Sequence, residues 1–83
     1  MMKDTVSEGD VTKWIDKITP FLERLRASND KGDGVIDNIN SYVSDSRHFL
    51  EKGDLVLAFE SMIWAWALFE TGQELGAIYV EEQ

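Results

Sequence analysis

The chain has 83 residues, with 16 acidic against 8 basic side chains, one histidine and no cysteine, for a net charge of -8. This length suits one small domain, and the lack of cysteine excludes disulfides and thiolate metal sites. The acidic balance argues against nucleic acid as a partner, because phosphate binding depends on clustered Lys and Arg. No basic and apolar leader opens the chain, so we expect a soluble cytoplasmic protein without a metal or a cofactor.

The first periodic segment covers residues 10–28 and has the pattern of an amphipathic helix. Its apolar residues fall within an arc of roughly 120° at helical spacing, and they are Val11, Trp14, Ile15, Ile18, Phe21, Leu22 and Leu25. Pro20 lies within this stripe and removes one helical hydrogen bond, so it either kinks the helix or starts a new one with Thr19 as its cap. Because the stripe continues in phase across Pro20, a kink is the favoured interpretation.

A turn cluster and a second helix follow. Asn29–Gly34, with the letters N-D-K-G-D-G, is the strongest turn signal in the chain and predicts the break between the first two helices. The second helix is expected over residues 35–52, with an apolar arc of roughly 140°. Gly53 then fits the left-handed position that ends a helix, and Asp54 fits the cap of the next one. A turn this short predicts that the second and third helices are antiparallel neighbours.

The third helix is expected over residues 55–71 and differs from the other two, because apolar side chains surround most of it. Only Glu60 and Ser61 are polar among residues 55–69. A helix that is apolar nearly all round must be buried nearly all round, and this one is shorter than the roughly 20 apolar residues that a bilayer requires. We therefore expect no membrane span. Residues 73–80 form an apolar tail, which is either a continued helix or an extended segment.

The apolar surface of this third helix exceeds what a three-helix bundle covers, which is a stripe of roughly 100–140°. A small sector consists of Ala58, Ser61, Ala65 and Gly72, and a bulky sector consists of Leu55, Phe59, Met62, Trp66 and Phe69. A third sector, with Leu57, Trp64 and Leu68, lies on the far flank of the small one and has little chain left to cover it. These three residues are the candidate self-association surface, and they predict a homodimer or another homo-oligomer.

Two polar patterns suggest metal or acid–base chemistry, and both have a simpler interpretation. Asp30–Asp37 resembles a calcium loop, but Lys31 occupies a ligand position and no bidentate glutamate follows, so an ordinary turn is expected. Asp45, His48 and Glu51 recur every three residues on the second helix, where a solvated face explains them. We expect no metal-binding, catalytic or cofactor-binding residues in this chain.

Two carboxylates support an alternative function. Glu60 is the only charge in the core of the third helix, and Asp45 borders the apolar stripe of the second. If they shared a cleft, the chain would be a small-ligand-binding or enzymatic helical domain. No motif with catalytic mechanics is present, however. The sequence therefore favours a non-enzymatic protein–protein interaction or self-association module.

The stretch from Tyr42 to Gly76 resembles the archaeal domain-of-unknown-function family 357. The matching positions are Tyr42, Asp45, Phe49, Gly53, Asp54, Ala58, Glu60, Ala65, Gly72 and Gly76. The family's usual glycine after its aromatic–Ala pair is Ala67 here, and Phe69-Glu70 stands where the family often has an aspartate. The resemblance implies a small up-and-down three-helix bundle without an assigned activity. This agrees with the all-α bundle and the tight Gly-Asp hairpin between helices two and three that periodicity predicts.

Overall fold

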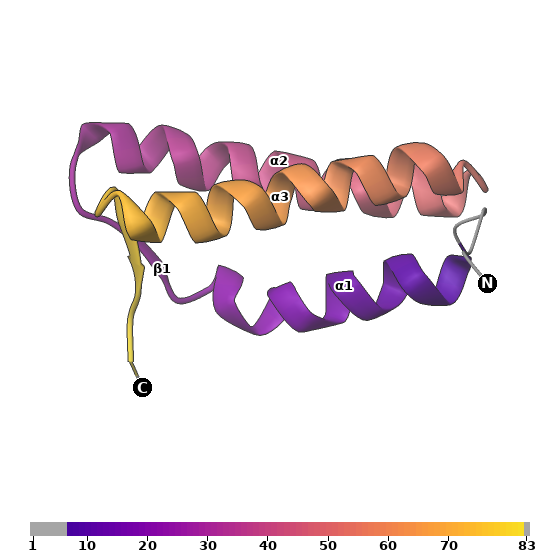
Figure 1. The fold of residues 1–83 in the computed structure, drawn as a ribbon, viewed down its shortest axis with the longest axis horizontal. Coiled ribbons are helices and arrows are strands. Elements are labelled where there is room, and N and C mark those ends of the chain that lie inside the picture. Colours follow the sequence, from indigo (N-terminus) through magenta and orange to yellow (C-terminus); the bar gives the residue numbers. More distant parts are fainter. Residues whose placement is uncertain (1–6, 83) are drawn as a thin grey trace.

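The structure is a computed structural model that describes residues 7–82. Its elements in chain order are α1 (Glu8–Leu22), β1 (Leu25–Ala27), α2 (Asp30–Glu51), α3 (Leu55–Glu74) and β2 (Ile78–Val80). The chain reverses direction from one helix to the next, α2 and α3 lie side by side, and α1 runs along this pair (Figure 1). The predicted all-α, up-and-down three-helix bundle is therefore confirmed, with a two-stranded sheet added at one end.

The first helix ends earlier than the predicted range of residues 10–28. It starts with a capping box, in which Ser7 Oγ accepts a hydrogen bond from the Asp10 N–H (3.2 Å) and Asp10 Oδ2 accepts one from the Ser7 N–H (3.0 Å). α1 continues across Pro20, so no new helix starts there. The apolar period extends to Leu25, but Leu25 belongs to β1, whose partner strand comes from the far end of the chain. Helical spacing alone could not reveal that pairing.

α2 starts at Asp30, and the turn expected over residues 29–34 is instead the cap and the first turn of this helix. The Asn29 side chain accepts a hydrogen bond from the Gly32 N–H at 3.0 Å, which satisfies one of the free donors at the helix start. Gly32 is buried, and a Cβ at this position would overlap the Ala77 carbonyl oxygen. The expected turn is wrong because this glycine allows two backbones to approach closely rather than a reversal of the chain.

The connection between α2 and α3 is a tight turn around Gly53 and Asp54. Gly53 has a φ of +80°, a left-handed conformation that glycine adopts without strain. The Asp54 side chain accepts a hydrogen bond from the Leu57 N–H at 3.1 Å and caps α3. The turn leaves the two helices antiparallel and adjacent along most of their length (Figure 1).

α2 and α3 approach closely because the facing side chains are small. The small sector of α3 is entirely buried, and it consists of Ala58, Ser61, Ala65 and Gly72. Ser46 of α2 is fully buried, and its Oγ donates a hydrogen bond to the Ala58 carbonyl at 2.7 Å, so its burial leaves no polar group unpaired. A Cβ at Gly72 would lie 3.1 Å from a side-chain carbon of Val35. Small side chains therefore bring α2 and α3 into close contact.

The apolar tail over residues 73–80 has a helical part and an extended part. α3 continues to Glu74, three residues beyond the predicted end, and its next turn is closed by Gly76 with a φ of +73°. The chain then forms β2, in which Ile78 is only 2% exposed. The tail is therefore not a helix that continues to residue 80: the helix ends at Glu74, and the extended alternative holds for Ile78–Val80.

β1 and β2 pair antiparallel and tie the C-terminal segment to the connection between α1 and α2. The register places Leu25 opposite Val80, Arg26 opposite Tyr79 and Ala27 opposite Ile78. Two further backbone hydrogen bonds extend the pairing, from the Ser28 N–H to the Ala77 carbonyl (2.8 Å) and from the Glu81 N–H to the Arg24 carbonyl (2.7 Å). We call these paired segments, residues 24–28 and 77–81, the β lock.

The length of α3 changes one expectation. It has 20 residues and contains an 18-residue window with a mean hydropathy of 1.2, so it is the one helix in the described part of the chain that is long and apolar enough to cross a membrane. The helix is Leu55–Glu74 rather than residues 55–71, so it is not too short to span a bilayer, contrary to the prediction from the sequence. A mostly buried core helix of a soluble bundle meets the same criterion; α3 packs against two other helices, and 33% of the window is buried. That the chain has no membrane partner stays a prediction.

Candidate functional site

The α2–α3 hairpin has two sides, and α1 covers only one of them. Trp66 of α3 contacts α1, where its Nε1 donates a hydrogen bond to the Trp14 carbonyl at 3.3 Å. Trp64 lies two residues earlier and therefore about 160° away around the helix axis, on the side remote from α1. Its side chain is 57% exposed. The two tryptophans thus mark a covered side and an uncovered side of the same helix.

We call the uncovered side the open face and define it by Tyr42 of α2 together with Leu57, Trp64 and Leu68 of α3. The rings of Tyr42 and Trp64 are stacked, with centroids 6.2 Å apart and an angle of 19° between their planes. Leu57 is 39% exposed, whereas Tyr42 and Leu68 are half-buried. The three α3 residues that the sequence singled out for self-association therefore share one face, which continues onto α2 through Tyr42.

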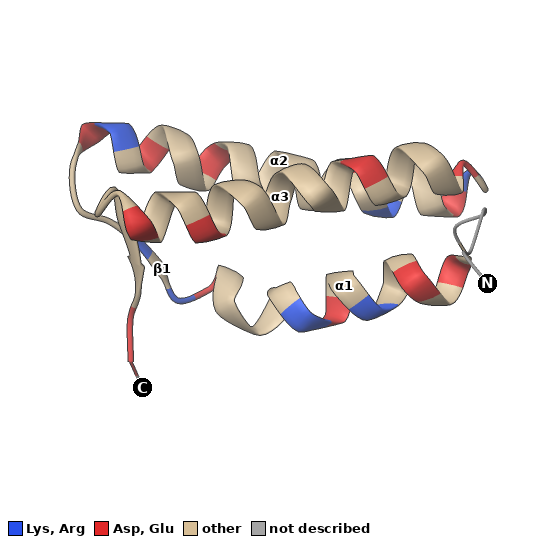
Figure 2. Cartoon of the chain, in the orientation of Figure 1, with Lys and Arg blue, Asp and Glu red and all other residues tan. Residues whose placement is uncertain are grey.

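The open face contains no charged residue, although the chain carries a net charge of -8. α3 as a whole has acidic side chains but no Lys or Arg, as the red and blue segments in Figure 2 show. Its acidic residues Glu60, Glu70 and Glu74 are not among the four defining residues. Glu60 nevertheless lies one turn before Trp64, and Asp45 lies one turn after Tyr42 on α2. The apolar patch is thus a small uncharged area that is bordered by carboxylates.

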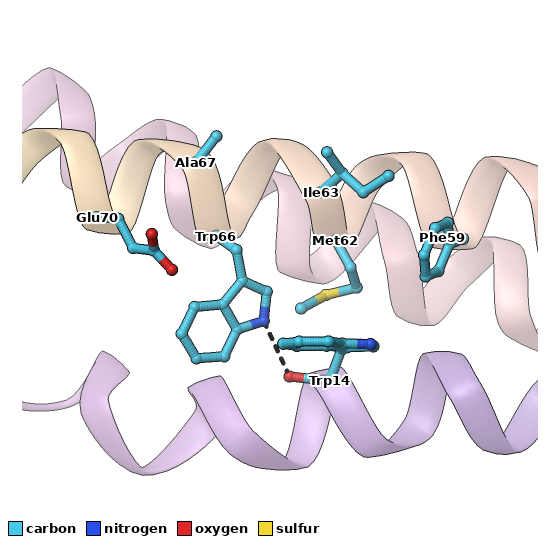
Figure 3. A pocket seen from close by; sticks show the side chains of 7 residues that line it. All are labelled: Trp14, Phe59, Met62, Ile63, Trp66, Ala67 and Glu70. Carbon is cyan, nitrogen blue, oxygen red and sulfur yellow. Dashed lines mark hydrogen bonds between the residues drawn. The ribbon is translucent and has the colours of Figure 1, made fainter.

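A groove lies between α1 and α3 (Figure 3), and we call it the α1–α3 groove. Its volume is about 300 Å³, and it is lined by Trp14, Phe59, Met62, Ile63, Trp66, Ala67 and Glu70. The Trp14 and Trp66 rings stand nearly perpendicular, at 77°, with their centroids 5.7 Å apart. Glu70 is the only charged residue of the lining. The groove is therefore an aromatic and aliphatic pocket with one carboxylate at its edge.

An aromatic stripe at helical spacing favours a core over a ligand pocket, so the sequence placed Phe59, Met62 and Trp66 in the bulky sector of the core and did not predict this groove. Met62 is indeed buried, at 1% exposure, but Trp14 is 39% exposed and Ile63 is 51% exposed. Large side chains fill the space between α1 and α3, whereas small ones bring α2 and α3 together. This difference in side-chain size is the feature of the sequence that could have predicted a groove. Helices that are held apart by bulky residues leave room at the edges of their contact.

The two carboxylates of the alternative site do not line the groove. Asp45 and Glu60 are both exposed. Glu60 lies on α3 near the exposed residues Ala67 and Thr71, on a strip between the groove and the open face. The structure therefore does not bring Asp45 and Glu60 together around this pocket.

The polar patterns considered for metal binding have ordinary surroundings. Within residues 7–82, no three His, Cys, Asp or Glu side chains are grouped as a metal ion would require. Asp45, His48 and Glu51 are exposed on α2, and the His48 ring contacts Phe49 with centroids 5.7 Å apart. Asp30–Asp37 is helical, so its backbone carbonyls point along the helix axis and do not converge on an ion.

Most other positions of the family pattern have structural roles. Three shape the turns that follow α2 and α3, namely Gly53, Asp54 and Gly76. Three allow the close approach of these helices, namely Ala58, Ala65 and Gly72. Phe49 is half-buried and packs against the core. Folding alone accounts for these residues, which directs attention to the open face and the groove.

Comparison with known proteins identifies a family and a solved structure of the same fold. A family model described as a protein of unknown function (DUF357) matches residues 10–78. The crystal structure of protein AF1782 from Archaeoglobus fulgidus, which carries the same family description, is 41% identical in sequence and has a TM-score of 0.79. The similarity covers 88% of this chain and 91% of that one. None of the curated proteins matches. The resemblance seen from Tyr42 to Gly76 is thus confirmed and extends over α1.

Proposed function

Because this chain belongs to the DUF357 family, for which no activity is known, we propose that it is a non-enzymatic self-association module. The open face of one copy, formed by Tyr42, Leu57, Trp64 and Leu68, binds the open face of a second copy. A two-fold axis relates the two copies, so the same patch serves on both sides of the contact.

The exposed Trp64 is the observation that carries this proposal. Tryptophan is among the residues that contribute most binding energy at the centres of protein interfaces. Here it stacks on Tyr42 with 57% of its surface exposed. α1 lies on the opposite side of the hairpin, and the tail is held in the β lock, so neither of them covers Trp64.

A second copy fits the open face better than a partner of opposite charge. A basic partner would be attracted to the acidic residues around the patch rather than to the patch itself. Two acidic copies repel each other, and contact through a neutral area keeps that repulsion low. The whole side of the hairpin remote from α1 measures about 30 by 20 Å, so a contact centred on the four residues of the open face can approach the roughly 800 Å² per partner that a stable interface buries.

The test is the molecular mass in solution, measured by light scattering after size exclusion over a range of protein concentrations. We expect the wild-type chain to form a dimer and the variant Trp64→Asp to be a monomer, because an unpaired carboxylate at the centre of the interface must be desolvated. Far-UV circular dichroism of Trp64→Asp should show the helical content of the wild type, since the side chain is exposed in one copy.

Val56→Asp is the matched control. Val56 is 61% exposed on the same helix but lies outside the open face, so this variant introduces the same charge without touching the proposed contact. It should keep the dimeric mass. A monomeric wild type at high concentration would refute the proposal, and so would loss of the dimer in both variants or in neither.

A further inference from the structure

The α1–α3 groove, which is separate from the open face, has walls of the kind that bind positive charge. The Trp66 ring lies across the groove between α1 and α3, with the Glu70 carboxylate beside it and Trp14 below it (Figure 3). The two indole rings therefore form perpendicular walls. The faces of aromatic rings carry negative electrostatic potential, so a cation placed against them is stabilised.

The rings are held in place without a ligand. The hydrogen bond from Trp66 Nε1 to the Trp14 carbonyl fixes one edge of the indole. The ring also packs at 85° against Phe69, with centroids 5.5 Å apart. Because the orientation of Trp66 is set by contacts within the chain, a ligand need not order it, which lowers the entropic cost of binding.

The charges around the groove favour a cation over an anion. The side chain of Glu70, the only charged lining residue, makes no hydrogen bond or ion pair with the residues that the structure describes. The net charge of -8 acts in the same direction. Lys17 of α1 has its Nζ 5.1 Å from the centroid of the Trp14 ring, so this indole already makes a cation–π contact within the chain. The Lys17 charge repels a second cation at Trp14, which leaves the Trp66 ring and Glu70 as the groups that attract one.

We propose that the α1–α3 groove binds a small organic cation with an alkylated ammonium group. The alkyl carbons contact the aliphatic side chains of Met62 and Ile63, and the positive charge faces the Trp66 ring and Glu70. A volume of about 300 Å³ is at the lower end of the range for ligand pockets. It suits a compact quaternary ammonium group rather than a nucleotide or a long lipid chain.

The test compares choline with 3,3-dimethyl-1-butanol, its neutral isostere, which has the same shape without the charge. Both are titrated at constant ionic strength while the indole N–H signals are followed by NMR. We expect choline to shift the Trp66 and Trp14 signals and to leave that of Trp64 unchanged, since Trp64 is remote from the groove. The neutral isostere should bind about threefold or more weakly, as the loss of a cation–π contact predicts.

Two matched variants locate the charge that matters. Glu70→Gln should weaken choline binding about threefold or more, whereas Glu74→Gln, which removes an exposed carboxylate of the same helix outside the groove, should not. Equal binding of choline and its isostere would overturn the proposal, as would equal weakening by both variants or no shift of the Trp66 signal. The same titration on Trp64→Asp, which is a monomer if the open face forms the dimer, separates the groove from self-association.

Discussion

Trp64 and Trp66 are two residues apart in α3, and the structure gives them different surroundings. Trp66 is half-buried, bonds to the α1 backbone and packs at right angles against the Trp14 ring. Trp64 is 57% exposed and stacks only on Tyr42. The amphipathic helix α1 can cover only one side of the hairpin. Because α3 is apolar on both sides, its other side remains uncovered within one chain. The proposed self-association rests on this uncovered apolar surface of α3.

The β lock explains why the C-terminal tail does not cover Trp64. A tail of apolar residues could have folded across Trp64, but β2 pairs with β1 at the end of the bundle. Ile78 is buried there beside Gly72. The tail thus fixes the position of α1 relative to the hairpin, and it leaves the open face uncovered.

The largest expected effect comes from Gly32→Ala, which disturbs the β lock that holds α1 on one side of the hairpin. The added Cβ would overlap the Ala77 carbonyl, which accepts the hydrogen bond from the Ser28 N–H, so the β lock must shift or open. We expect the free energy of unfolding to fall by about 2–3 kcal/mol, even though alanine is the better helix former. Urea denaturation followed by circular dichroism measures this loss.

Gly34→Ala is the control for that prediction, because it makes the same substitution two residues later in α2. A Cβ at Gly34 meets no atom within 4 Å. Alanine should therefore raise the free energy of unfolding by about 0.5–1 kcal/mol through its helix propensity alone. If both substitutions stabilise the protein, the close contact between Gly32 and Ala77 does not exist.

The next prediction compares how substitutions of the two tryptophans change the free energy of unfolding. Trp66→Leu removes the contact with Trp14 and should lower the free energy of unfolding by about 2 kcal/mol at every protein concentration. Trp64→Leu removes little within one chain, so its effect should be below about 0.5 kcal/mol in dilute protein. It should grow with concentration, because self-association stabilises only the wild type. Equal effects of the two substitutions, independent of concentration, would show that the open face has no partner.

The hairpin could be predicted from sequence because its signals are local. Gly53 and Asp54 are consecutive, and each makes its characteristic turn or cap contact within a few residues. The β lock could not be predicted, since its strands have three residues each and are stabilised by pairing across the length of the chain. Leu25 continues a helical stripe and also fits a buried strand position, so periodicity could not decide between them.

Of the two candidate sites, the open face could be predicted from the sequence and the α1–α3 groove could not. The helical period alone places Leu57, Trp64 and Leu68 on one side of α3, and this could be seen in the sequence. The groove depends on how far α1 stands from α3, which the contact between Trp14 and Trp66 sets across two separate helices. That spacing is a property of packed side chains and has no local pattern.

The smallest expected effect concerns the ion pair on the β lock. Arg26 Nη2 lies 2.8 Å from a Glu81 carboxylate oxygen, but the two side chains are 47% and 52% exposed. An exposed pair of this kind couples by about 0.2–1 kcal/mol, and salt screens it. A double-mutant cycle of Arg26→Ala and Glu81→Ala should give a coupling energy at the low end of that range, and it should fall in high salt.

The position of α1 should survive the loss of this ion pair, because the backbone bond from the Glu81 N–H to the Arg24 carbonyl does not depend on either side chain. Hydrogen exchange at the β1 and β2 amides is the sharpest measurement of this. Protection in the double variant should match the wild type, while Gly32→Ala should lose it. If the double variant loses protection as completely as Gly32→Ala, charge rather than backbone pairing holds the lock, and the covered side of the hairpin depends on salt.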